Sequence, residues 1–137
     1  MCLARLTDFK VSKKHGWKVF FCLGGSLHGE FCGTNEERKV NRWLDSDDFL
    51  YDENREQLIC DSTETYPVGW HIFLRKEDAK IWMKKSVFKK HLVIRKVLFK
   101  EIVAKGEQQF FCDKIILFKV VVAKKIKILP QKKKTKK

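Results

Sequence analysis

The stretch from Tyr66 to Met83, which reads YPVGWHIFLRKEDAKIWM, constrains the fold more than any other part of the chain. Its opening, Tyr66-Pro67-Val68-Gly69, predicts a turn, because proline fixes φ at about −65° and glycine accepts φ values that other residues avoid. Residues 70–74 are aromatic or aliphatic apart from His71, which is the composition of a buried strand. We therefore expect a turn followed by a strand, with His71 beside the turn.

A helix is predicted directly after this strand. Glu77 and Asp78 place negative charge where it favours the amino end of a helix. Ala79 and Trp82 then recur at helical spacing, so one apolar face can pack against the strand. We expect this helix over residues 76–87.

The C-terminal third predicts two further strands. Residues 92–104 read as one strand that ends before Gly106, and residues 114–129 read as a longer one that Pro130 stops. From Ile116 onward the even positions of the longer strand are apolar except for Lys124, which predicts one face on the core and one in water. Those apolar positions are Ile116, Phe118, Val120, Val122, Ile126 and Ile128. The short connection between the two runs predicts a hairpin.

The N-terminal half gives weaker signals of the same kind. We expect strands over 4–11, 17–23 and 26–32, a hairpin turn at Gly24-Gly25, and a short helix over 36–44. Residues 45–65 are rich in acids and poor in apolar anchors, which is typical of a surface loop.

These elements predict an α+β fold: a mostly antiparallel sheet of about five or six strands, with one main helix packed on it. At 137 residues the chain fits a single domain. We expect that domain over 1–130, with an acidic loop at about 45–65, and a disordered Lys-rich tail over 131–137.

The composition points to an intracellular protein. No apolar run approaches the roughly 20 residues that span a bilayer, so we expect no membrane partner. The five cysteines are odd in number and widely spread, which favours reduced thiols rather than a disulfide framework. We expect the cytoplasm, or the host cell if the protein is viral, and the Lys-rich tail also fits the nucleus.

The net charge of +13 is unevenly distributed. Residues 36–64 hold ten acidic residues against four basic ones, whereas residues 65–137 hold 21 basic residues against five acidic ones. This polarity predicts a polyanionic partner for the C-terminal part, and an acidic segment that shields or competes with it.

Nucleic acid is the polyanion we expect first. A Lys-rich segment binds phosphates without reading bases, and the excess of Lys over Arg favours contact that is not sequence-specific. The same lysines are also consistent with a solubilising tail or with lysine enrichment throughout the chain. The candidate nucleic-acid-binding residues are Lys119, Lys124, Lys125, Lys127, Lys132, Lys133, Lys134, Lys136 and Lys137.

A pocket around His71 is the alternative hypothesis. Tyr66, Trp70 and Glu107 are the residues that we expect to line it with His71, which can act as an acid or base near neutral pH. A histidine in such a strand is more commonly a buried structural residue whose hydrogen bonds are satisfied. Cys22, His28 and Cys32 lack the spacing of zinc sites, so we expect no metal and no cofactor.

The central and C-terminal residues resemble a group of small uncharacterised proteins from phages, large DNA viruses and bacteria. The resemblance covers roughly 66–129 and implies a fold without implying any activity. The matching residues are Gly69-Trp70-His71-Ile72-Phe73, Glu77-Asp78-Ala79, Ile94 with Val97, Ala104 with Gly106 and Gln108, and Val120-Val121-Val122-Ala123.

A weaker resemblance is to ADP-ribosyltransferase domains, which also place an aromatic strand before a helix. Their catalytic glutamate would fall near Lys119, which is not an acid, so Glu107 would have to serve in its place. We therefore expect a non-catalytic protein of viral or phage type that binds nucleic acid or another polyanion. A nucleotide-binding or ADP-ribosyltransferase-like pocket around His71 and a protein–protein adaptor are the alternatives.

Overall fold

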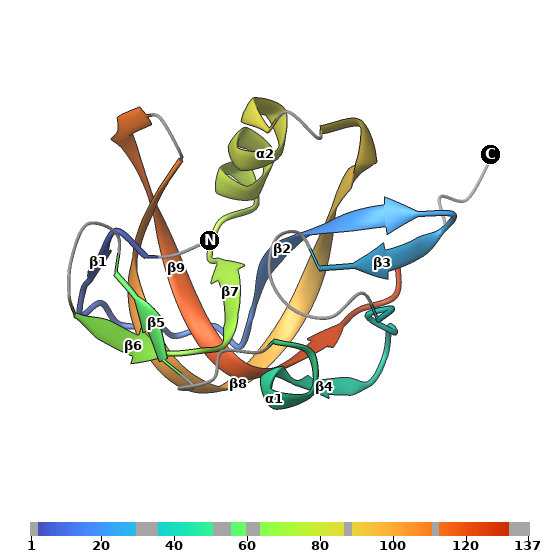
Figure 1. The fold of residues 1–137 in the computed structure, drawn as a ribbon, viewed down its shortest axis with the longest axis horizontal. Coiled ribbons are helices and arrows are strands. Elements are labelled where there is room, and N and C mark those ends of the chain that lie inside the picture. Colours follow the sequence, from blue (N-terminus) through green and yellow to red (C-terminus); the bar gives the residue numbers. More distant parts are fainter. Residues whose placement is uncertain are drawn as a thin grey trace.

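The fold is dominated by one long, strongly curved hairpin of two strands, β8 (Leu92–Phe110) and β9 (Asp113–Ile128) (Figure 1). The structure is a computed structural model that describes residues 3–29, 36–50, 56–59, 64–86, 89–110 and 113–131. The two strands pair antiparallel along most of their length, with a register shift between Ile102 and Ala104. Such a shift bends a strand and increases its twist, which accounts for the curvature of the hairpin.

Two shorter strands close the hairpin into a ring. β2 (His15–Leu23) pairs with the first part of β8, and β7 (Trp70–Phe73) pairs with the middle of β9. β2 and β7 also pair with each other, at Trp17 and Phe73. All of these pairings are antiparallel, so the four strands form a closed antiparallel ring.

Three short strands extend this sheet, giving seven strands in the described part of the chain. They are β1 (Arg5–Leu6) on β8, β3 (Ser26–His28) on β2, and β4 (Trp43–Asp45) on β9. A separate pair is formed by β5 (Glu56–Leu58) and β6 (Thr65–Pro67). The helices are α1 (Ser46–Phe49), α2 (Lys76–Lys85) and the short 3₁₀ turn η1 (Lys89–His91).

Buried apolar side chains form two clusters on opposite faces of the strands. One contains Ala79 and Trp82 of α2, and Trp82 packs on Phe73 and Phe118 with ring centroids 5.8 and 6.2 Å away. The other contains Trp70 and Ile72 of β7 together with Leu44, Val97 and Phe99. β7 is buried on both sides, because its alternate residues enter different clusters.

The structure confirms the α+β class with a mostly antiparallel sheet and one main helix. The strand after the 66–69 segment, the helix from Lys76 and the long C-terminal hairpin all form where the sequence predicts them. The Gly24-Gly25 turn is also confirmed, with φ values of 59° and 85°. The sheet has more strands than expected, because short runs such as β1 and β4 join its edges.

Several element boundaries were predicted wrongly. Residues 36–44 form no helix: Asn41 has a φ of 62°, and Trp43–Asp45 pair with β9 instead. The 4–11 strand is reduced to Arg5–Leu6. The 45–65 loop contains α1 and β5, and Thr65–Pro67 form a strand rather than the start of a turn.

Two glycines are required because the neighbouring strand leaves no room for a Cβ atom, not because they lie in turns. A Cβ on Gly69 would lie 2.7 Å from the Ala123 carbonyl oxygen, so only glycine lets β7 begin this close to β9. Gly106 does not end β8 as predicted. It lies inside the strand, where a Cβ would meet the Arg5 carbonyl oxygen of β1.

The predicted alternation in β9 is only partly right. Phe118, Val120 and Val122 pack in the α2 cluster, but Ile126 and Ile128 pack in the other one. Val121 and Ala123, at odd positions, are also fully buried, because they pack in the second cluster on the other face of the strand. The change of face falls at Lys124–Lys125, opposite Glu101 with its φ of 59°.

Candidate nucleic-acid interface

Four side chains gather on the solvent-facing side of β4, β9 and β8, and we call them the basic sheet face: Trp43, Lys100, Lys125 and Lys127. Residues directly opposite each other in antiparallel strands project to the same face. Trp43 is opposite Lys127, and Lys125 is opposite Lys100. The register of three strands therefore places an aromatic ring among three lysines, with the Asp45 carboxylate on the same face opposite Lys125.

Trp43 and Lys100 are in direct contact on this face. The Lys100 ammonium lies 4.0 Å from the centroid of the Trp43 ring, within the range of a cation–π interaction. Trp43 nevertheless remains 40% exposed. A large aromatic ring is thus available to solvent in a strongly basic setting.

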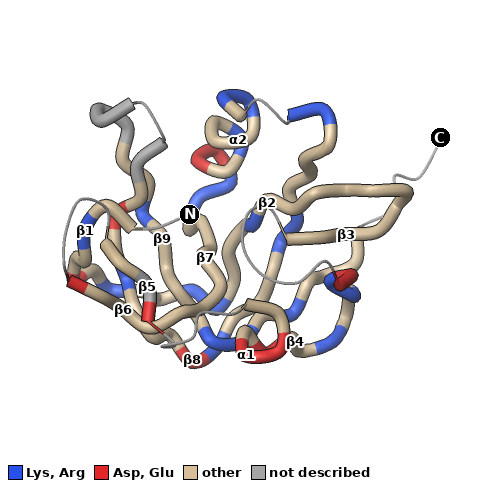
Figure 2. The backbone as a smooth tube through the Cα atoms, in the orientation of Figure 1, with Lys and Arg blue, Asp and Glu red and all other residues tan. Residues whose placement is uncertain are grey.

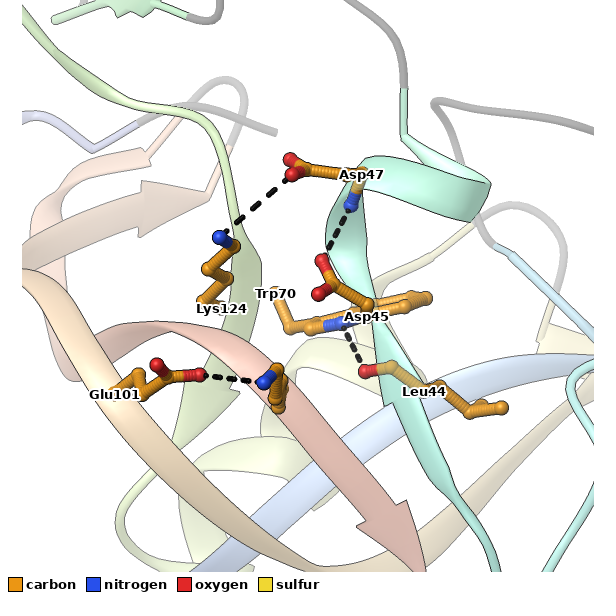
Figure 3. Close-up of polar contacts among 7 residues, drawn as sticks. Leu44, Asp45, Asp47, Trp70, Glu101 and Lys124 are labelled. Atoms are coloured by element: carbon orange, nitrogen blue, oxygen red, sulfur yellow. Dashed lines mark hydrogen bonds and ion pairs between the residues drawn. The ribbon is translucent and has the colours of Figure 1, made fainter.

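The edge strand that presents Trp43 is fixed by the core. The Trp70 indole N–H donates to the Leu44 carbonyl oxygen at 3.1 Å, and Leu44 itself is buried opposite Ile126 (Figure 3). Asp45 then caps α1, since its carboxylate accepts a hydrogen bond from the Asp47 backbone N–H at 3.0 Å. Trp43 therefore projects from an anchored strand.

Two carboxylates border the basic sheet face. Asp47 of α1 pairs with Lys124 at 3.7 Å, and Glu101 pairs with Lys125 at 3.2 Å (Figure 3). Both pairs are solvent-exposed and are therefore weak. Figure 2 shows the acidic residues of α1 beside a basic stretch of β9. The acidic segment thus contacts the basic strand that it was expected to shield.

The predicted lysines do not form one surface. Lys125 and Lys127 lie on the basic sheet face, whereas Lys124, which precedes them in β9, pairs with Asp47 of α1. Lys119 lies further back along β9, with its ammonium 5.7 Å from the centroid of the Phe9 ring. The remaining candidates, Lys132, Lys133, Lys134, Lys136 and Lys137, lie outside the described residues.

Lys119 belongs to a groove at the start of α2, which we call the α2 groove. It has a volume of about 420 Å³ and is open to solvent. Its charged lining residues come from the 9–13 segment, from β9 and from the first turn of α2: Lys10, Lys13, Arg75, Lys119 and Asp78. The groove and the basic sheet face are separate sites on the same long strand.

Tyr66 and His71 meet as the pocket hypothesis expects, but they meet inside the core. The Tyr66 hydroxyl lies 2.9 Å from His71 Nε2 and accepts the Leu3 backbone N–H, also at 2.9 Å. We assign the hydroxyl as the donor to Nε2, which places the ring proton on Nδ1, in agreement with the backbone hydrogen bond of the His71 side chain at Gly69. Tyr66 is 1% exposed and His71 is 7% exposed.

Burial decides the charge of His71. Desolvation, helped by Lys18 and the N-terminal amine, lowers the pKa of His71 to about 3. The Lys18 ammonium donates to the His71 carbonyl oxygen at 2.9 Å, so a cation is already held beside this residue. His71 is neutral at physiological pH, with a ring that bonds to buried partners. This is the arrangement of a structural histidine.

The other two predicted pocket residues do not converge on His71. His71 is opposite Val122 in β9, whereas Trp70 is opposite Ala123 and Glu107 is opposite Lys119. Even and odd positions of this stretch face opposite sides, so Trp70 and Glu107 lie across the sheet from the His71 ring. The Glu107 carboxylate instead accepts two hydrogen bonds from the Arg5 guanidinium, at 2.8 and 3.0 Å.

Comparison with protein-family models, with curated proteins and with solved structures gives no match for this chain. Within the described ranges no group of His, Cys, Asp or Glu is arranged to hold a metal ion. In the same part of the chain no helix is long and apolar enough to span a bilayer.

Sequence reasoning missed Trp43 and Lys100. Trp43 was missed because residues 36–44 were predicted to be a helix, whereas Trp43 lies in β4, opposite Lys127 of β9. Lys100 lies in a segment that was correctly read as a strand, but only the pairing with β9 places it beside Lys125. An Arg-Trp pair next to an acidic run was the available signal for an exposed edge.

Proposed function

We propose that this protein is a non-catalytic domain that binds single-stranded nucleic acid on the basic sheet face without reading its base sequence. The observation that supports this most is the exposed Trp43 ring with the Lys100 ammonium 4.0 Å from its centroid and Lys127 directly opposite. Proteins that bind single strands combine a basic surface along the backbone with aromatic rings on which bases stack.

The chemistry of the face favours single strands over duplexes. A base can stack on an indole ring only when it is unpaired and splayed from its neighbours. The cations beside Trp43 are lysines, which neutralise phosphates as point charges and do not form the bidentate contacts by which arginine reads guanine. Affinity without sequence preference follows from this composition.

The Lys-rich end of the chain supports the same function. Where the chain leaves β9, the Leu129 N–H donates to the Lys96 carbonyl oxygen at 3.0 Å and the Arg95 guanidinium donates to the Leu129 carbonyl oxygen at 2.7 Å. The chain is thereby held against β8 just before the lysines of 132–137 in the sequence. Each phosphate that these lysines neutralise adds affinity through counterion release.

A titration of Trp43 variants tests this proposal. We expect Trp43→Ala to weaken binding of a fluorescein-labelled oligothymidylate of about 16 nucleotides by roughly tenfold, because stacking on one aromatic ring is worth about 1–3 kcal/mol. Trp43→Phe, which keeps a ring, should retain most of the affinity. The measurement is fluorescence anisotropy, with a duplex of the same length as a competitor.

Two outcomes would contradict the proposal. One is equal affinity of the wild type, Trp43→Ala and Trp43→Phe for the single strand. The other is a duplex that competes as well as the unlabelled single strand, because duplex bases cannot stack on Trp43.

A further inference from the structure

The α2 groove contains the features of a site for a small organic anion. Four cations, Lys10, Lys13, Arg75 and Lys119, line it against one carboxylate, that of Asp78. Lys10, Lys13, Arg75 and Lys119 are solvent-exposed, so their charge is available to a ligand. Charge complementarity therefore selects an anion.

The walls of the groove are apolar as well as basic. Phe9, Leu74 and Leu117 line it together with the cations, and Leu117 is 39% exposed. A bare inorganic ion would leave these side chains uncovered. A ligand that has an anionic end and a flat apolar body would satisfy both parts of the lining, and the volume of about 420 Å³ lies within the range of small-molecule pockets.

The groove is held open by fixed elements. The Lys105 ammonium donates to the Phe9 carbonyl oxygen at 2.8 Å and lies 3.3 Å from the Asp8 carboxylate, which ties the 9–13 segment to β8. On the opposite wall the Leu74 N–H donates to the Lys119 carbonyl oxygen at 3.4 Å, which ties the start of α2 to β9. Both walls are therefore attached to the β8–β9 hairpin.

From this arrangement we propose that the α2 groove binds a nucleotide through a terminal phosphate, with the phosphate on Arg75 and Lys119 and the base against Phe9. Guanidinium and ammonium groups are the usual partners of phosphate oxygens, and an aromatic ring is the usual partner of a base. The nucleotide is either free or the phosphorylated end of a strand. The site does not depend on binding at the basic sheet face.

Calorimetric titration of the full chain with AMP, adenosine and inorganic phosphate tests the proposal. We expect AMP to bind more tightly than either of its parts. Arg75→Gln combined with Lys119→Gln should weaken AMP binding about tenfold or more, since two charge-assisted hydrogen bonds are lost. The matched control, Lys89→Gln combined with Lys90→Gln, removes the same charge from the exposed η1 turn, outside both proposed sites, and should leave AMP binding unchanged.

A second variant distinguishes lost binding from lost folding. Asp78→Asn removes the carboxylate of the groove and should tighten AMP binding about fivefold, because a like charge near the phosphate is removed. A misfolded protein cannot give this gain. If Asp78→Asn leaves the affinity unchanged or lowers it, the phosphate does not lie in this groove.

Oligonucleotides with and without a 5′-phosphate distinguish a free nucleotide from the phosphorylated end of a strand as the ligand. A 5′-phosphorylated strand that binds more tightly than its 5′-hydroxyl counterpart, with the difference abolished by Arg75→Gln and Lys119→Gln, assigns the site to strand ends even where AMP binds weakly. The proposal is overturned if the charge-matched pairs of variants weaken AMP equally, or if neither AMP nor the 5′-phosphate responds to Arg75→Gln and Lys119→Gln.

Discussion

The His71 ring accepts the Tyr66 hydroxyl proton at Nε2, and the Tyr66 oxygen accepts the Leu3 N–H, so one buried chain of hydrogen bonds joins the distant N-terminal segment to β6 and β7. The energetic consequence is a dependence of stability on pH. The folded protein holds His71 neutral down to a pKa of about 3, whereas an unfolded chain protonates it near its ordinary value of 6.5. Between these values the unfolded state binds the extra proton.

We therefore expect acid to destabilise the wild type through His71. The contribution is fully present above pH 6.5 and is lost as the pH falls toward 3, at about 1.4 kcal/mol of unfolding free energy for each pH unit. Urea unfolding of the wild type and of His71→Gln at several pH values measures it. The difference in unfolding free energy between the two should shrink as the pH falls, and a constant difference from pH 7 to pH 4 would refute the neutral, buried state of His71.

Single residues also limit what a sequence can predict. Gly69 was correctly expected at the boundary before β7, but for the wrong reason: it is needed because β9 lies too close for a Cβ, which only the tertiary structure reveals. His71 was left between a catalytic and a structural role, because its partner Tyr66 is enclosed by a long-range contact with Leu3.

At the scale of elements, the long hairpin was predictable and its twist was not. Alternating apolar residues predict β8 and β9, but two irregularities change which face is buried: the register shift after Ile102 and the left-handed Glu101. At this bend Glu101 pairs with Lys125, and Lys100, in the regular ladder just before it, contacts Trp43. The same pairing created the basic sheet face, so the sequence could indicate its lysines but not their grouping.

Glu101 is expected to oppose nucleic-acid binding. Glu101→Gln removes the carboxylate that pairs with Lys125 at 3.2 Å, and the affinity for a single strand should rise about fivefold, because a charge next to the phosphates is removed. Glu77→Gln, an equal change of charge on the exposed surface of α2, is the matched control. Anisotropy titrations in low salt compare the two variants, and an equal gain from both would mean that net charge rather than position governs binding.

The short elements were the least predictable. β1 and β4 contain too few residues for a periodic pattern, and they form because an open edge of β8 or β9 is available to pair with them. The helix predicted over 36–44 does not form, because tertiary pairing outweighs the local helix propensity. Trp43 and Leu44 pair with β9 instead, and Leu44 is buried beside Ile126.

For the whole molecule, the charge separation along the sequence is reduced in space. The net charge of +13 is real, but Asp47 of the acidic segment contacts Lys124 and Glu101 contacts Lys125. What remains is a basic sheet face at one part of β9 and a basic groove at another. We propose that the positions of the lysines on β8 and β9, rather than the net charge of the protein, determine where a nucleic-acid strand binds.

The salt dependence of single-strand binding tests this claim most directly. Lys100, Lys125 and Lys127 are replaced together by Gln, and Lys76, Lys80 and Lys84 of α2 are replaced in a control with the same net charge. For single strands each phosphate contact contributes about 0.7 to the slope of log affinity against log salt, so loss of three contacts should reduce the slope by about 2 in the first variant. The α2 variant should keep the wild-type slope, and an equal loss of slope in both variants would contradict the account.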